Sequence, residues 1–136
     1  MRYRAWDVDD SIMYEDVIPM YLEGELINLI LEWENTGYDF SEVELKLYDT
    51  TYIYRDEEFP YYIMEYTGDY DREGKELCES DYVILDKIKN KKFEVVKDGR
   101  NFQLKEVGGE LTLKIDYLHE NTDFEIIGNK YDTTEG

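Results

Sequence analysis

The strongest constraint on the fold is a succession of short apolar and aromatic runs, most of them ended by glycine or polar turn residues. Several runs alternate apolar and polar positions, which is typical of strands with one buried face. Asp98-Gly99, which lies between two such runs, is the clearest hairpin signal. The expected strands cover residues 2–6, 43–48, 52–54, 61–66, 82–85, 93–96, 102–107, 111–115 and 124–127.

One segment in the N-terminal half has the spacing of a helix. Apolar residues recur there at intervals of three and four, at Leu22, Leu26, Leu29, Ile30 and Trp33. Residues 35–37 (Asn-Thr-Gly) provide a helix end. The run 29–31 leaves a strand as the alternative, but the regular placing of glutamates favours the helix. We therefore expect a mainly β (α+β) fold of small antiparallel sheets with one helix.

The chain is long enough for one domain with its own core. It has 136 residues, 42% of them hydrophobic and 14 of them tyrosine, which excludes the weakly hydrophobic chains that stay disordered. We expect a single domain over residues 1–136, with an N-terminal subregion 1–60 and a C-terminal β subregion 61–136 as its only division.

The charge of the chain is strongly negative. It has 15 basic and 34 acidic residues, a net charge of −19, and residues 1–66 alone carry 4 basic and 17 acidic residues. Such a charge opposes direct binding to nucleic acid or anionic lipid. The one basic cluster, which contains Lys87, Lys89, Lys91 and Lys92, is interpreted as an exposed hairpin turn and not as a nucleic-acid patch.

Localisation signals point to the cytoplasm. No apolar run approaches the roughly 18 residues of a membrane span, and the first residues lack the apolar centre of a signal peptide. A single cysteine, Cys78, cannot form an internal disulfide, which agrees with a reducing compartment.

Residues 69–75 (Asp-Tyr-Asp-Arg-Glu-Gly-Lys) resemble the start of an EF-hand calcium loop. Ser80 stands where that loop needs a bidentate glutamate, so an acidic turn is the favoured interpretation. Residues 7–10 (Asp-Val-Asp-Asp) are a weaker candidate, because Ile12 replaces the required glycine. We expect no metal site and no cofactor.

No recognisable catalytic set is present. His119, the one histidine, precedes a turn-rich stretch and is interpreted as an exposed loop residue. Cys78 lies between Glu76 and Glu79, which disfavours a reactive thiolate, and is expected to be half-buried. Phosphate loops, zinc spacings and serine elbows are missing from the sequence. A hydrolase built on carboxylates such as Asp69, Asp71, Glu73 and Asp81 is the least favoured class.

Tyrosines concentrate in the centre of the sequence. Because tyrosine combines apolar area with a hydrogen-bonding tip, this group is a candidate recognition surface, although packing within sheets explains most of it equally well. The candidate residues are Tyr61, Tyr62, Tyr66, Tyr70 and Tyr82.

Three segments resemble, in order, the YopX-like family of phage and prophage proteins. They are residues 4–7 (Arg-Ala-Trp-Asp) followed by 13–14 (Met-Tyr), a long central segment from 64–68 (Met-Glu-Tyr-Thr-Gly) to 79–83 (Glu-Ser-Asp-Tyr-Val), and 124–131 (Phe-Glu-Ile-Ile-Gly-Asn-Lys-Tyr). Together they span nearly the whole chain. Residues 20–60 match no family signature, and Ser80 and Cys78 depart from the family pattern.

The resemblance implies a phage-encoded accessory protein with a mainly β fold and an SH3-like or barrel-like C-terminal part, and it supplies no catalytic residues. We therefore expect a non-enzymatic protein that acts in the bacterial cytoplasm by binding another protein or a second copy of itself. The alternative is an acidic mimic of nucleic acid that occupies a host DNA- or RNA-binding protein. Solubility is the simpler explanation of the acidity.

Overall fold

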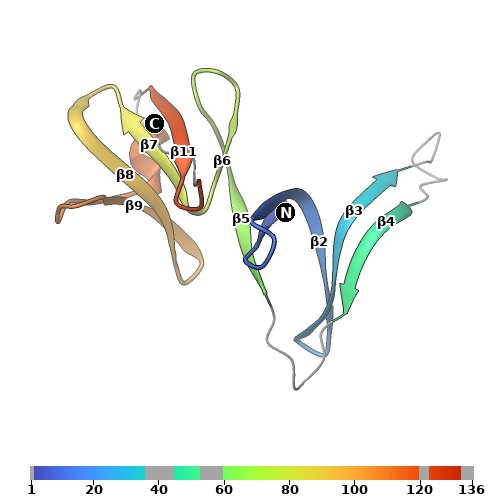
Figure 1. Cartoon of the computed structure of the whole chain (residues 1–136). Helices are drawn as coiled ribbons and strands as arrows, with labels where there is room; N and C mark the ends of the chain where they lie inside the picture. The colour runs from blue at the N-terminus through green and yellow to red at the C-terminus, as the bar shows by residue number, and fades with distance from the viewer. Residues whose placement is uncertain (1, 36–44, 53–59, 120–122, 133–136) are drawn as a thin grey trace. The chain divides into compact units, whose positions relative to one another are not determined.

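The computed structural model describes residues 2–35, 45–52, 60–119 and 123–132, and the side chains of 32–35 and 45–52 lie outside this description (Figure 1). The described residues form eleven strands and one short 3-10 helix. These are β1 (Tyr3–Asp7), β2 (Ile12–Leu22), β3 (Glu25–Asn35), β4 (Leu45–Tyr52), β5 (Tyr61–Tyr70), β6 (Glu76–Cys78), β7 (Asp81–Leu85), β8 (Ile88–Asp98), β9 (Asn101–Glu106), β10 (Thr112–Lys114), η1 (Ile115–His119) and β11 (Phe124–Asn129).

The strands form two antiparallel sheets, in the orders β4-β3-β2-β1-β5-β6 and β10-β9-β8-β7-β11. The mainly β prediction is confirmed, although the strands 12–22 and 76–78 were not expected. Residues 43–44 and 53–54 of the predicted strands lie outside the described residues. None of the helices within the described ranges is both long and apolar enough to cross a membrane.

The predicted N-terminal helix is wrong, and a hairpin takes its place. Leu22 pairs with Glu25, so Glu23 and Gly24 alone connect β2 to β3. Both have positive φ, 52° and 82°, as a type I′ turn requires. The strand alternative through residues 29–31 is correct: the run lies in β3 between β2 and β4, and Leu29 and Leu31 are buried in a core with Ala5 and Val17. The apolar spacing predicted that one face of a helix would be buried. In the structure, contacts with other strands of the N-terminal unit bury Leu29 and Leu31 instead.

We expect Glu23→Asn to stabilise the protein by about 0.5–1 kcal/mol. Glu23 adopts the left-handed conformation at a cost that asparagine largely avoids, and Asn-Gly is the preferred pair for this turn. Urea unfolding of the full chain measures the change. Glu25→Asn, two residues later in a strand, serves as control and should give no gain. Equal stabilisation by both variants would refute the turn as the cause.

The chain divides into two compact units, residues 1–64 and 65–136, and β5 runs from the first into the second. In the N-terminal unit, a small core of Ala5, Val17, Leu29 and Leu31 is covered by Tyr3, Tyr14, Tyr61 and Ile63. These residues come from β1, β2, β3 and β5, so the core depends on strands that are distant in sequence.

The C-terminal unit has the larger buried cluster. Strands β7 to β10 follow one another as antiparallel neighbours, and β11 returns to pair with β7 (Figure 1). The predicted hairpin is confirmed, but its turn lies one residue later than Asp98-Gly99: Asp98 pairs with Asn101, so Gly99, with a φ of 62°, and Arg100 form the connection. The core contains Leu77, Val83, Leu85, Phe93, Val95, Leu104, Leu118, Phe124 and Ile126.

Candidate functional site

The candidate tyrosines are divided between the two units of the chain. Tyr61 packs on the core of the N-terminal unit, while its neighbour Tyr62 is exposed. In the C-terminal unit, Tyr66 and Tyr70 pair with β6 opposite Cys78 and Glu76, and Tyr70 is exposed. Tyr82 lies on β7, with the Lys92 ammonium 4.5 Å from its ring centre. Tyr62 and Tyr70 are therefore the most exposed members of the group.

Asp71, the third residue of the calcium-loop-like segment, is buried and acts as a structural acceptor. Its Oδ1 accepts hydrogen bonds from the backbone N–H groups of Glu73 and Lys75, at 3.0 and 2.9 Å. Its Oδ2 accepts one from the N–H of Ile126, at 3.0 Å. These bonds close the turn on itself and join it to β11.

The same turn covers the outer edge of β11. Arg72 N–H donates to the carbonyl of Phe124 at 3.1 Å, and Asp71 accepts from Ile126 two residues further along. An edge strand with free backbone groups invites pairing with other chains. The acidic turn therefore caps an edge of the five-stranded sheet, which explains its sequence without a bound ion.

Hydrogen bonding determines the ionisation of Asp71. Burial by itself raises the pKa of this carboxyl group. The backbone hydrogen bonds from Ile126, Lys75 and Glu73, together with the charge of Lys75, outweigh burial and hold the pKa of Asp71 below its usual value. Asp71 is therefore a carboxylate at neutral pH, as its three N–H donors require.

Two other candidate acids, Asp69 and Asp81, have different partners. The Asp69 carboxylate contacts His119 Nε2 at 2.6 Å and accepts from the Thr67 hydroxyl at 3.0 Å. Asp81 is buried on β7 and accepts from the Cys78 N–H at 2.8 Å. Across the described ranges, His, Cys, Asp and Glu side chains form no group of three that could hold a metal ion.

The remaining candidates from the sequence are Asp7, His119 and Cys78, and each of them has an intramolecular hydrogen-bond partner. The Asp7 carboxylate accepts from the N–H groups of Asp9 and Asp10, so residues 7–10 form the expected polar turn between two strands. His119 is exposed at the end of η1. Cys78 is fully buried, not half-buried as predicted: β6 pairs with β5 and places Cys78 opposite Tyr66, where its thiol donates to the Glu65 carbonyl.

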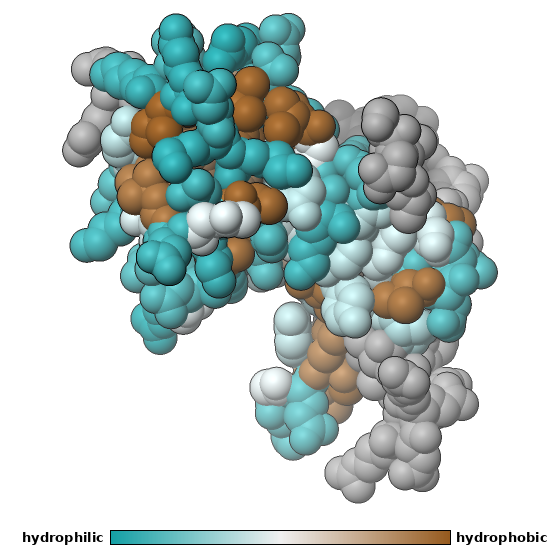
Figure 2. Space-filling view, turned by 60° about the vertical axis from the view of Figure 1, so that its left-hand side comes forward, coloured by the Kyte–Doolittle hydropathy of each residue, from teal (hydrophilic) through white to brown (hydrophobic). Residues whose placement is uncertain are grey.

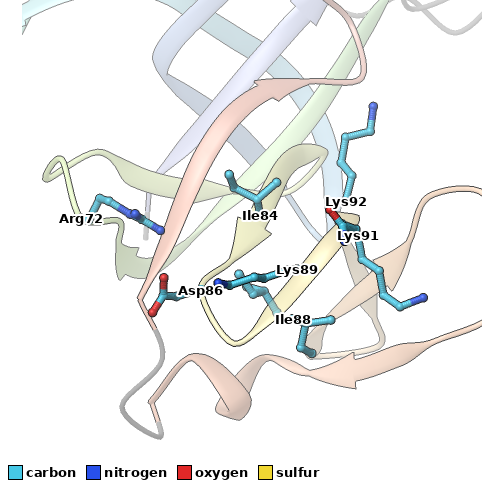
Figure 3. Close-up of a pocket in the computed structure, with 9 residues that line it drawn as sticks. Arg72, Ile84, Asp86, Ile88, Lys89, Lys91 and Lys92 are labelled. Carbon is cyan, nitrogen blue, oxygen red and sulfur yellow. The ribbon is translucent and has the colours of Figure 1, made fainter.

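A pocket of about 430 Å³ lies beside the hairpin of β7 and β8. Four of its six charged and polar lining residues are basic, and its apolar lining comes from Ile84, Leu85 and Ile88. The basic side chains belong to the turn after β5 and to the start of β8 (Figure 3). The charged and polar lining residues are Arg72, Asp86, Lys89, Asn90, Lys91 and Lys92.

A bulge in β8 creates this pocket. Leu85 pairs with Ile88 and Val83 with Phe93, so residues 89–92 of β8 lie opposite Ile84 alone. Asn90, at a φ of 66°, provides the irregular backbone. The lysine cluster thus belongs to a hairpin, as expected, but most of it lies in the bulged strand. The sequence indicated the lysine cluster. Only the structure shows that Lys89, Lys91 and Lys92 line one pocket with Arg72, Ile84 and Ile88.

The four basic side chains of the pocket fall into two pairs. Lys91 donates to the Glu106 carboxylate at 3.0 Å, which lowers the pKa of Glu106, and Lys92 lies over the Tyr82 ring. Both extend away from the pocket centre in Figure 3, whereas the Arg72 and Lys89 side chains point toward a common region near Asp86. Neither Arg72 nor Lys89 has a side-chain ion pair with any residue that the structure describes.

A second surface lies at the closed end of the β2–β3 hairpin, in the N-terminal unit. Four large apolar side chains are exposed there: Met20 (43%), Tyr21 (57%), Leu22 (61%) and Ile27 (40%). We call these residues the hairpin surface. Figure 2 shows hydrophobic side chains at this end of the molecule next to hydrophilic ones at the turn. Three consecutive apolar residues before Glu-Gly were the available sequence signal.

Fold and site together define a mainly β protein of two antiparallel sheets with a basic pocket and an exposed apolar hairpin end. The chain belongs to the YopX family: the family model described as YopX protein matches residues 2–135. This confirms the family resemblance found in the sequence.

A solved structure has the same fold. The crystal structure of protein EF1440 from Enterococcus faecalis is similar over 94% of this chain and 91% of its own, with a TM-score of 0.69 and 25% sequence identity. Comparison with curated proteins found no match. The name of the solved protein states neither an activity nor a partner.

Proposed function

We propose that this chain is a phage or prophage accessory protein of the YopX family that acts, without catalysis, by binding another protein. The hairpin surface is the observation that carries the proposal. Its four apolar side chains are each at least 40% exposed. Large apolar side chains exposed together at one end of a hairpin mark protein interaction sites more often than apolar residues exposed singly do.

The chemistry of the hairpin surface fits a protein contact. Tyr21 and Leu22 expose more of their surface than the other members, and tyrosine is among the residues that dominate interface energies. Glu23 and Glu25 are exposed beside them and provide a charged rim. The type I′ turn holds these side chains on paired strands, which limits the entropy lost on binding.

The SH3-like or barrel-like form of the C-terminal unit is part of the same proposal. Its support is the shared core: Leu113 of β10 and Phe124 of β11, on the two outer strands of one sheet, pack on the same cluster. A flat sheet would keep its outer strands on separate parts of the core, whereas a curled sheet brings them together.

The test uses Tyr21→Asp with Leu22→Asp, which we expect to weaken partner binding at least about tenfold. Affinity capture of the tagged full chain from bacterial host lysate identifies the partner, and its dissociation constant is then measured with each purified variant. Val107→Asp, at an apolar residue of the C-terminal unit that is 40% exposed, is the matched control. Light scattering of the same proteins measures self-association.

The outcomes separate the surfaces. Binding that is lost in the hairpin variant and kept in Val107→Asp supports the hairpin surface, and the same pattern in light scattering makes a second copy the partner. Binding that survives in the hairpin variant but is lost in Tyr70→Asp moves the contact to the exposed tyrosines. A wild-type protein that captures nothing and stays monomeric contradicts the proposal.

Mimicry of nucleic acid is the second candidate, because the N-terminal unit is strongly acidic. Residues 1–64 carry 4 basic and 16 acidic residues, a net charge of −12. Exposed carboxylates include Asp9, Asp10, Glu15 and Glu25. This function predicts a basic nucleic-acid-binding partner whose capture is lost at high salt. Apolar binding through the hairpin surface should instead survive high salt.

A further inference from the structure

We propose that the pocket beside the β7–β8 hairpin is a binding site for a phosphate monoester carried on a small apolar body. This inference is independent of the hairpin surface, which lies in the other unit. It rests on the composition of the pocket, on the two cations directed into it and on the charge of the whole chain.

The inward-pointing cations match the charge of the proposed ligand. Arg72 and Lys89 reach the same region from two separated chain segments, and neither side chain has an ion pair with a described residue. A phosphate monoester carries close to two negative charges at neutral pH. The planar guanidinium can bind two phosphate oxygens at once, while the lysine provides a point charge.

The rest of the pocket suits an organic ligand. Ile84, Leu85 and Ile88 line one part of it, so a ligand with an apolar body would bury that body while its phosphate meets the cations. A volume of about 430 Å³ lies within the range of small-molecule sites and exceeds the needs of a free phosphate ion.

The overall charge makes the local arrangement significant. A net charge of −19 repels anions at long range, so electrostatic attraction to this site must arise from the contacts within the pocket. Asp86, the acid that lines the pocket, opposes binding and provides a sensitive test. Replacing it with asparagine removes the opposing charge while keeping a similar shape.

The experiment titrates the full chain with phenyl phosphate and follows backbone amide NMR shifts. We expect saturable shifts centred on residues 84–92 and on Arg72. Arg72→Ala and Lys89→Ala should each weaken binding about tenfold, and Asp86→Asn should strengthen it about fivefold. Inorganic phosphate should bind more weakly than phenyl phosphate, and phenol more weakly still.

Lys87→Ala is the matched control, because Lys87 is exposed in the same hairpin but does not line the pocket. It should change the dissociation constant less than about twofold. Equal weakening by Lys87→Ala and Lys89→Ala would show general charge attraction and overturn the site, as would shifts that do not saturate or that map elsewhere. Unfolding midpoints of all variants verify that each one is folded, and these exposed side chains leave the core intact.

Discussion

Asp71→Ala is expected to destabilise the C-terminal unit by about 3 kcal/mol. The substitution removes the acceptor of three backbone N–H groups, those of Glu73, Lys75 and Ile126. A charged acceptor contributes more than a neutral one, and its loss leaves donors without partners at a buried position. Urea unfolding of the full chain, monitored by backbone NMR signals of β11 and β7, measures the effect in this unit.

Asp71→Asn separates the hydrogen bonds from the charge. The asparagine oxygen can still accept at the Oδ1 position from Glu73 and Lys75, but its NH₂ group then faces the N–H of Ile126, and two donors meet. We expect a loss of about 1–2 kcal/mol, smaller than that of alanine. A loss below about 0.5 kcal/mol in both variants would contradict the role of this turn in capping β11.

The Asp71 carboxylate also predicts a pH dependence. The pKa of Asp71 in the folded state lies below its usual value, so the unfolded state binds a proton at this group more tightly, and protonation favours unfolding. Its contribution to stability is complete above the unfolded pKa near 4 and is lost as the pH falls through the lower folded pKa. As the pH falls below the unfolded pKa near 4, stability should therefore fall less steeply in Asp71→Asn than in the wild type. The pKa of Glu106 is also lowered, and its contribution to the pH dependence of stability is the same in both proteins.

Phe93→Ala is expected to cost about 3–5 kcal/mol. Phe93 is fully buried in β8, where Val83 and Glu106 pair with it on its two sides, so the sheet cannot easily close over the lost ring. The same urea experiment measures the loss. Phe102→Ala is the control: this ring is only partly buried at the margin of the same core and should cost about 1–2 kcal/mol. Equal losses would show that Phe93 is not central.

Much of the β structure was predictable because local signals and tertiary pairing agree. Residues 61–66, 82–85 and 102–107 combine aromatic or β-branched residues with turn signals at their ends, and strands form there. The Asp98-Gly99 signal marked the hairpin correctly, although the turn itself is Gly99-Arg100. The helix prediction failed because the turn at Glu23-Gly24 was not recognised: glutamate rarely adopts the left-handed conformation that the first position of this turn requires.

The candidate site was predictable only in pieces. The lysine cluster and the calcium-loop-like turn were both visible as patterns, but their relation was not. The bulged part of β8 places Lys89 in the pocket that Arg72 also lines, and the hydrogen bonds of Asp71 bind that arginine's turn to β11. The local sequence pattern predicts neither arrangement, because each one depends on which strands pair.

The sequence by itself determined the family, the predominance of strands, the position of several turns and the acidic charge, because each of these is written in local pattern or composition. The tertiary structure alone decided that residues 25–35 form a strand between two others, that Asp71 caps a sheet edge and that Arg72 and the β7–β8 hairpin line one basic pocket. The physical reason is that the residues that bury a strand and pair with it come from distant segments of the chain. The local spacing of apolar residues does not specify which segments these are.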